Sequence, residues 1–239
     1  MNLFENYTST AVLANADEAT LTRISSRNFE RNILPLLPAD RQAKVLDIGC
    51  GYGRYLKALE SSGYVDVYGI DVSEEQIAYA RERLGLRNCM CGDALEFLGD
   101  QSGTYDVILL LDVMEHLDIA YAVELCRAVH RALKPGGLFV VQVPNGLSPM
   151  SPHLHADVTH QRAFTTQSVE QVLRRSGFSG FRHSATPMPV HGLKSLIRRT
   201  VWELVVNPLL KAYFLVVVGS TLGGIYTPNL LTATTKSPD

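Results

Sequence analysis

Hydrophobic and polar residues alternate along the chain in blocks that predict strands followed by helices. The predicted strands are Lys44–Ile48, Val65–Ile70, Arg87–Cys91, Tyr105–Leu111, Leu138–Val143, Phe178–Ala185 and Gly224–Thr234. The predicted helices are Arg54–Ser62, Ser73 to about Leu84, Ile119–Leu133, Thr165–Ser176 and His191–Val218, the last with a break near Pro208. Strands that alternate with helices through short connections predict an open, mostly parallel α/β sheet.

The length of the chain predicts a single domain, 1–239. Its 239 residues, of which 46% are hydrophobic, are enough for one sizeable core. We expect a helical cap over residues 1–40 and a core over residues 41–144. The remaining part, 145–239, is expected to carry a loop on the acceptor side, inserted helices and the final strands.

The formal net charge of −2 is an average of two unlike parts. Residues 1–170 hold 14 Lys and Arg against 22 Asp and Glu, whereas residues 171–239 hold 8 against 2. An acidic body therefore carries a basic C-terminal third. The basic residues are few and no aromatic-rich basic stripe accompanies them, so we expect no nucleic-acid partner.

Cysteine usage and the apolar segments favour a cytoplasmic protein. The four cysteines, at 50, 89, 91 and 126, form no zinc-ligand spacing, and a chain of this length folds without disulfides. No basic and apolar leader is visible before Asp17. Val201–Val218 is interrupted by polar residues, which leaves Ala212–Val218 as an unbroken run far shorter than the ~20 residues of a membrane span. We therefore expect no span there.

A glycine-rich turn is the most informative stretch of the sequence. A buried strand runs into Gly49, Gly51 and Gly53 and then into a helix, as in sites where a ligand approaches the backbone closely. A dinucleotide site would place a further glycine where this chain has Arg54, and Asp47 would repel a pyrophosphate. The acidic residue suits a cationic ligand instead.

Two further acids extend this site. Asp71 ends the second strand, where a carboxylate can accept hydrogen bonds from both ribose hydroxyls. Asp93 follows the third strand and can bind an exocyclic amine such as that of adenine. An adenosine ligand with a cationic, amine-bearing tail fits this set, and S-adenosylmethionine is such a ligand.

Five ordered motifs make the sequence resemble the class I S-adenosylmethionine-dependent methyltransferases. They are Val-Leu-Asp-Ile-Gly-Cys-Gly-Tyr-Gly (45–53), Gly-Ile-Asp-Val-Ser (69–73), Gly-Asp-Ala (92–94), Tyr-Asp-Val-Ile-Leu-Leu-Leu-Asp-Val-Met-Glu-His-Leu (105–117) and Leu-Lys-Pro-Gly-Gly (133–137). The resemblance implies a three-layer Rossmann-like fold with a mostly parallel seven-stranded sheet and an antiparallel last strand. Gly224–Thr234 would supply that strand.

The same resemblance assigns roles to individual residues. It implies that Asp47, Gly49, Gly51 and Gly53 line the methionine part, that Asp71 holds the ribose, that Val72, Asp93 and Ala94 meet the adenine, and that Leu111 supplies backbone near the cofactor.

Histidines at two places supply candidates for proton transfer. His116 follows the fourth predicted strand, and His160 lies in the loop after the fifth, so both should border one cleft. A hydroxyl acceptor needs a base, and we expect His160 to be that base, with His116 as the second choice. The alternatives are a structural role for His116 at a helix start and a loop-anchoring role for His160.

A divalent metal site at the same histidines is an alternative to a catalytic base. Some ubiquinone-type and small-RNA-end methyltransferases place an acid-x-x-Glu-His motif and a distant histidine on a divalent ion, and Asp112, Glu115, His116 and His160 match that pattern. Many relatives with Glu-His-Leu carry no metal, so no metal ligand is assigned.

The C-terminal third resembles a narrower group, bacterial methyltransferases associated with surface-polysaccharide biosynthesis. Segments 157–169, 175–178, 198–202 and 223–233 carry this second resemblance. It implies O-methylation of a sugar or glycan hydroxyl. The alternatives are a small-molecule acceptor such as a quinone, a phenol or a natural product, or a non-catalytic cofactor-binding subunit.

The apolar stripe between residues 193 and 205 has two interpretations. Basic side chains at Lys194, Arg198 and Arg199 flank it. The helices either pack on the domain or on a second copy in a homodimer, or they lie on an anionic membrane surface, with the protein peripheral to the inner membrane.

Overall fold

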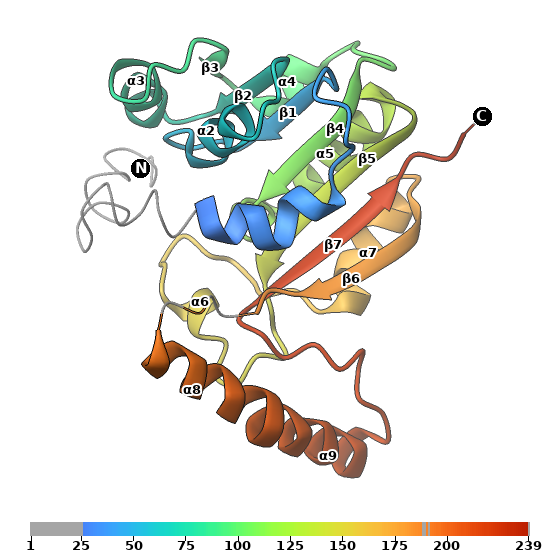
Figure 1. Cartoon of the computed structure of the whole chain (residues 1–239). Coiled ribbons are helices and arrows are strands. Elements are labelled where there is room, and N and C mark those ends of the chain that lie inside the picture. The colour runs from blue at the N-terminus through green and yellow to red at the C-terminus, as the bar shows by residue number, and fades with distance from the viewer. Residues whose placement is uncertain (1–25, 188–189, 191, 239) are drawn as a thin grey trace.

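The structure, a computed structural model, describes residues 26–187, 190 and 192–238 as one seven-stranded sheet between helices (Figure 1). The strands are β1 (Val45–Ile48), β2 (Val67–Asp71), β3 (Cys89–Cys91), β4 (Tyr105–Leu111), β5 (Leu133–Pro144), β6 (Ser179–Ala185) and β7 (Asn229–Thr235). The helices are η2 (Phe29–Ile33), η3 (Leu34–Leu36), α2 (Arg54–Ser61), α3 (Glu74–Glu82), α4 (Ala94–Leu98), η4 (Met114–His116), α5 (Ile119–Ala132), α6 (Pro152–His155), α7 (Thr166–Arg175), α8 (Leu193–Val201), η5 (Trp202–Val206) and α9 (Asn207–Val218).

The sheet has the order β3-β2-β1-β4-β5-β7-β6. Strands β1 to β5 run parallel, and β7 lies antiparallel between β5 and β6. The predicted fold class, a mostly parallel seven-stranded sheet with an antiparallel last strand, is confirmed. Each predicted strand is present, with ends shifted by a few residues.

Helices cover both faces of the sheet and make the three layers. One core cluster joins the sheet to α4, α5 and α7, with Leu125 and Leu173 fully buried. The other joins it to η2, α2 and α3, with Phe29 and Leu59 fully buried. Strand β4 is buried at every position except Asp106, because it contributes side chains to both clusters.

The strand order places the ligand edge. From β1 the chain moves outward to β2 and β3, and then returns to the other side of β1 as β4. At such a switch point the connections after β1 and β4 diverge and leave a crevice at the carboxyl ends of the strands. The glycine turn after β1 and the segment after β4 therefore face each other.

Some sequence-based expectations need correction. Helix α4 was not predicted, since its five residues are too few to show a periodicity, and α6 lies inside the segment expected to be a loop. The helical cap over residues 1–40 stays a prediction: residues 1–25 lie outside the described residues, and η2 and η3 occupy Phe29–Leu36.

The break predicted near Pro208 is wrong. Elements α8, η5 and α9 form one continuous 26-residue helix, Leu193–Val218. The reason is a π-helical turn directly before the proline, in which the Asn207 amide donates to the Trp202 carbonyl five residues back. The wider turn carries the chain past a residue that has no amide proton of its own. The run is therefore longer than the sequence suggested, and none of residues 193–218 is buried.

Candidate functional site

A cleft of about 1150 Å³ opens at the carboxyl edge of the sheet. Its walls come from the segments after β1, β2 and β4, from the end of β5, from the loop 153–160 and from α8. Eight of the residues singled out from the sequence line it: Gly49, Gly51, Asp71, Val72, Ala94, Leu111, His116 and His160. Asp47, Gly53 and Asp93 do not line it.

The glycine turn gives the cleft a floor of bare backbone. Gly49 and Gly51 have φ values of 69° and 55°, in the region that favours glycine. A Cβ on Gly49 would lie 2.3 Å from Val113 Cγ2, and one on Gly51 would lie 2.7 Å from Gln76 Oε1. Side chains at these positions would therefore displace residues that form the wall. Gly53 serves packing instead, since a Cβ there would lie 2.2 Å from Leu86 Cδ1.

Asp71 lies at the end of β2 with both oxygens held in place. Its Oδ2 accepts the Gly51 amide at 2.8 Å and its Oδ1 accepts the Ser73 amide at 2.8 Å. The Ser73 side chain in turn accepts the Gln76 amide and caps α3. Because the Ser73 amide bonds to Asp71, it does not bond to the Gln76 side chain as it would in a capping box. Burial raises the pKa of Asp71, while these amide bonds oppose that shift. The carboxylate is thus fixed against the glycine turn, and Val72 beside it is 57% exposed.

Asp47 lies beneath the glycine turn as a buried acid that lacks full compensation. Its side chain is 1% exposed, and its Oδ2 has no hydrogen-bond partner among the described residues. Burial raises the pKa of Asp47 to about 8, although the positive charge of Arg54 opposes the shift. A cationic ligand near the turn would stabilise the ionised form.

Asp93 has structural tasks that the sequence did not reveal. Its Oδ1 accepts the amides of Leu95 and Glu96 and caps α4, and its Oδ2 accepts the Tyr121 hydroxyl at 2.6 Å. This carboxylate places α4 and its first residue, Ala94, at the cleft wall. A contact between Asp93 and adenine stays a prediction.

The sequence analysis missed an ion pair at the mouth of β4. Arg54 Nη2 donates to Asp112 Oδ2 at 2.9 Å, and Gln142 Nε2 donates to Asp112 Oδ1 at 2.8 Å. Asp112 has a φ of 58°, which is strained for a residue with a side chain. The departure of Arg54 from the dinucleotide pattern was the available signal, but its partner lies 58 positions away.

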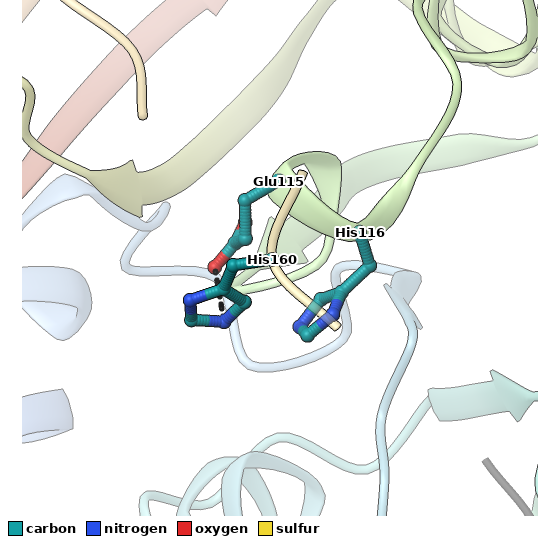
Figure 2. A group of neighbouring side chains, drawn as sticks. All are labelled: Glu115, His116 and His160. Atoms are coloured by element: carbon teal, nitrogen blue, oxygen red, sulfur yellow. Dashed lines mark ion pairs between the residues drawn. The ribbon is translucent and has the colours of Figure 1, made fainter. Parts of the chain in front are cut away.

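Glu115, His116 and His160 lie close together (Figure 2), and all three line the cleft. The two imidazole rings lie edge to face with centroids 4.6 Å apart. His160 Nε2 lies 3.9 Å from Glu115 Oε1, and the other oxygen of this buried carboxyl has no partner among the described residues. Histidines 44 positions apart in the chain thus reach the same point in space.

Hydrogen bonds fix which ring nitrogen of each histidine carries the proton. The Leu154 carbonyl can only accept, so His160 Nδ1 at 3.1 Å must donate and Nε2 is the basic nitrogen. The Thr159 hydroxyl donates to Asp157 Oδ1 at 2.6 Å and therefore accepts from His116 Nδ1 at 2.8 Å. Both rings then have a basic Nε2.

Burial favours the neutral forms of Glu115 and His116. It raises the pKa of Glu115, with a further increase from Asp112, and lowers the pKa of His116, with a further decrease from His160. A positive charge that forms here would favour ionisation of Glu115. The group is suited to taking up a proton or a cation.

The same three side chains fit a divalent ion. One ligand atom from each can be chosen so that all lie within 4.8 Å of one another. In the two histidines, Nδ1 bonds to a backbone carbonyl (His160) or to the Thr159 hydroxyl, which itself bonds to Asp157 (His116). Similar outer hydrogen bonds orient the imidazoles of metal sites. Asp112, the fourth member of the expected pattern, bonds to Arg54 and Gln142.

Comparison with known proteins adds a family match. The family model described as a methyltransferase domain matches residues 21–182. The ubiquinone biosynthesis O-methyltransferase of Ruegeria pomeroyi is 32% identical over 128 residues, which cover 52% of this chain and 50% of the relative. The N-terminal Xaa-Pro-Lys N-methyltransferase 1 of Mus musculus is 33% identical over 124 residues, which cover 49% and 55%. The chain spans about half the length of these curated relatives.

Solved structures agree on the fold. A SAM-dependent methyltransferase from Archaeoglobus fulgidus superimposes with a TM-score of 0.67 at 21% identity, over 92% of this chain and 100% of that one. At this identity the likeness concerns the fold alone. The surface-polysaccharide group suggested by residues 157–233 finds no support among these relatives and stays a prediction.

Proposed function

We propose that this chain, which belongs to the methyltransferase-domain family, transfers the methyl group of S-adenosylmethionine to a hydroxyl of a small acceptor of quinone or phenol type. The observation that carries the proposal is that one cleft is lined both by Gly49 and Asp71 and by His116 and His160. One side suits an adenosine with a cationic tail. The other suits removal of a proton from the acceptor.

On the cofactor side, each proposed role follows from a side-chain environment. The ammonium and sulfonium groups of the cofactor would offset the buried charge of Asp47, and the fixed carboxylate of Asp71 would accept the ribose hydroxyls. Val72 and Ala94 would contact the adenine, and Leu111 would border the cofactor at the end of β4. These placements stay proposals.

On the acceptor side, His160 would take the proton of the attacking hydroxyl. S-adenosylmethionine would supply the methyl carbon and S-adenosylhomocysteine would leave, while His160 Nε2 would accept the proton of the hydroxyl oxygen that attacks this carbon. Glu115 lies 3.9 Å from that nitrogen and would stabilise the imidazolium. His116 stays the second choice, because burial lowers its pKa and so makes it a weaker base than an exposed histidine.

Calorimetric titration with S-adenosylhomocysteine tests the cofactor assignment. Asp71→Ala should weaken binding about 10- to 100-fold, since it removes hydrogen bonds to a charged group. Asp100→Asn changes an exposed acid after α4 and should leave binding unchanged. Equal affinity in Asp71→Ala and the parent would exclude the assigned ribose role.

A turnover assay with phenolic acceptors tests the base. His160→Gln should lower kcat about 10²- to 10⁴-fold while the affinity for S-adenosylhomocysteine stays unchanged. His155→Gln, which alters an exposed histidine outside the cleft wall, is the matched control. Full turnover in His160→Gln with loss in His116→Gln would transfer the role to His116.

A second candidate mechanism is metal assistance at Glu115, His116 and His160. A divalent ion held there would lower the pKa of an acceptor hydroxyl. Turnover that falls in a chelator and returns with added Mg²⁺, Mn²⁺ or Zn²⁺ would support it. Unchanged turnover in the chelator would leave His160 as the base.

A glycan hydroxyl or a catalytically silent cofactor-binding subunit remain the alternatives from the sequence. Labelled cofactor offered with phenols, quinols and sugars in parallel distinguishes them. Methylation of sugars alone would favour the glycan acceptor. No methylation of any of them, with intact S-adenosylhomocysteine binding, would favour the silent subunit.

A further inference from the structure

The helix Leu193–Val218 leaves its apolar side chains in solvent. It has a mean hydropathy of 1.7 over its most apolar 18-residue window, and none of that window is buried. Leu204 is 72% exposed and Val216 is 86% exposed. A contiguous apolar surface of this kind marks an interaction site in a soluble domain. In Figure 1 the helix lies apart from the sheet, along one end of the molecule.

Only one stripe of the helix turns toward the domain. Its members are half-buried and recur at helical spacing: Ser195, Arg199, Trp202, Val206, Leu210 and Phe214. Phe214 stacks on Tyr226, a buried residue of the segment that leads into β7, with ring centroids 5.2 Å apart. The helix is thus fixed along one side, and the opposite apolar side stays available.

The short connection after the helix prevents it from crossing a bilayer. It belongs to an insertion between β6 and β7, whose ends pair at Ala185 and Leu230. The returning chain is held again at Ile225, whose carbonyl accepts from Asn145 Nδ2. Residues 219–224 reach at most about 20 Å when extended, whereas the hydrocarbon core is about 30 Å thick. An extended return through lipid would also leave its backbone polar groups unsatisfied.

The charge of the insertion favours an anionic surface. Residues 186–228 contain Lys194, Arg198, Arg199 and Lys211 against the single carboxylate of Glu203. Glu203 already lies 3.8 Å from Arg199, within an ion pair of the same helix. A second copy of this helix would bring the same excess of basic residues over acidic ones. Basic side chains, one tryptophan and exposed aliphatic residues on one helix suit the headgroup region of a membrane.

The helix also borders the cleft. Arg198 on α8 and Thr186 and Pro187 before it contribute to the cleft wall. A surface that holds the helix would therefore lie next to the cleft.

We propose that the helix Leu193–Val218 lies in the plane of an anionic lipid bilayer, with its exposed apolar face among the acyl chains and headgroups, and that it brings the cleft to the membrane surface. Membrane docking does not depend on the chemistry in the cleft. A second statement rests on the proposed function: the acceptor is a lipid-soluble molecule that enters the cleft from the membrane side.

Co-sedimentation with lipid vesicles measures this docking, because Trp202, the only tryptophan of the sequence, lies on the half-buried stripe and not on the exposed apolar face. Vesicles of phosphatidylcholine with phosphatidylglycerol should bind the protein. Pure phosphatidylcholine vesicles should bind less, and added salt should weaken binding because it screens the basic residues.

Paired substitutions separate docking from folding. Leu204→Glu with Val216→Glu should lower vesicle affinity about tenfold or more, because both side chains are outward and apolar. Val65→Glu is the matched control, since Val65 is 64% exposed and lies before β2, at a distance from the helix in the chain. All variants should keep the parent's affinity for S-adenosylhomocysteine, which shows that the domain is folded.

Each outcome decides the proposal. Retained vesicle binding in the Leu204 and Val216 variant, or equal loss in the Val65 variant, would overturn it. If the parent protein does not bind anionic vesicles but forms a dimer, and the double variant is monomeric, the apolar face contacts a second copy of the chain instead. Vesicle binding without methylation of any lipid-soluble quinol would leave docking intact and reject the membrane-borne acceptor.

Discussion

Strand β4 and helix α9 contain similar residues and have opposite surroundings. Apart from Asp106, Tyr105–Leu111 and Phe214–Val218 both consist of aliphatic and aromatic residues. All of β4 except Asp106 is buried between β1 and β5, whereas no residue of α9 is buried. Hydrophobicity along the chain therefore does not tell whether a segment builds the core or meets something outside the molecule.

Position in the topology makes the difference. Strand β4 lies at the switch point, where two strands and two helical layers leave it no solvent contact. Helix α9 belongs to an insertion that starts and ends on the edge pair β6 and β7. The core can thus fold without using the apolar face of α9, and the face stays free for docking.

The largest expected effect lies in the buried region. Leu110→Ala removes a fully buried side chain from the centre of β4 and should lower the free energy of unfolding by about 2–5 kcal/mol. Urea denaturation followed by circular dichroism measures the change. A loss below about 1 kcal/mol would contradict the view that β4 is the centre of the core.

A second effect tests the buried acid beneath the glycine turn. The pKa of Asp47 is about 8 in the folded chain, against 3.8 for a free aspartate side chain, so the folded state holds the proton more tightly. Its stabilisation is fully present below about pH 4 and is lost as the pH rises toward 8, at up to about 1.4 kcal/mol per pH unit. Asp47→Asn should flatten the decline.

Urea titrations of ligand-free protein from pH 5 to pH 8 measure that slope. Asp71 and Glu115, whose pKa values are also raised, contribute the pH dependence of stability that remains in Asp47→Asn. An unchanged slope in Asp47→Asn would show that Asp47 is already ionised in the folded protein.

A smaller effect concerns a helix anchored to the core. Thr165 accepts the Ser168 amide, and Ser168 Oγ accepts the Thr165 amide, at the start of α7. Thr165→Ala should lower the free energy of unfolding by about 1 kcal/mol. Thr166→Ala, at the next position, is the control. Equal losses in both variants would contradict the assigned cap.

The smallest effect is expected in the exposed helix. Val217→Ala removes a 61% exposed side chain from α9 and should change the free energy of unfolding by less than about 0.5 kcal/mol in dilute, lipid-free solution. A loss comparable with that of Leu110→Ala would mean that α9 is buried against a partner in solution, and the contrast with β4 would fail.

Local patterns in the sequence were sufficient for the fold and for the cofactor edge. The run Val45–Ile48 before three glycines and the apolar Tyr105–Leu111 predicted the strands and the cleft at their ends. The tasks of Asp93 could not be predicted, because they depend on Tyr121, 28 positions away, and on a helix too short to show a period. The pairing of His160 with Glu115 likewise depends on how the loop after β5 folds back.

The continuous helix was hidden for a different reason. Pro208 normally predicts an interruption, and the sequence carries no sign of the π turn at Trp202–Val206 that accommodates it. Pattern reading therefore underestimated the length of the apolar segment. The exposure of its side chains is a property of the insertion and not of its composition.

The pairing of Ala185 with Leu230 makes the β6–β7 hairpin a joint at which the insertion is attached. Everything between these two residues leaves and re-enters the sheet at one point, while the glycine turn and Asp71 lie on the other half of the sheet. A different insertion at this point would change the surface to which the protein binds and the acceptor that it receives. It would leave the strands that carry the glycine turn and Asp71 unchanged.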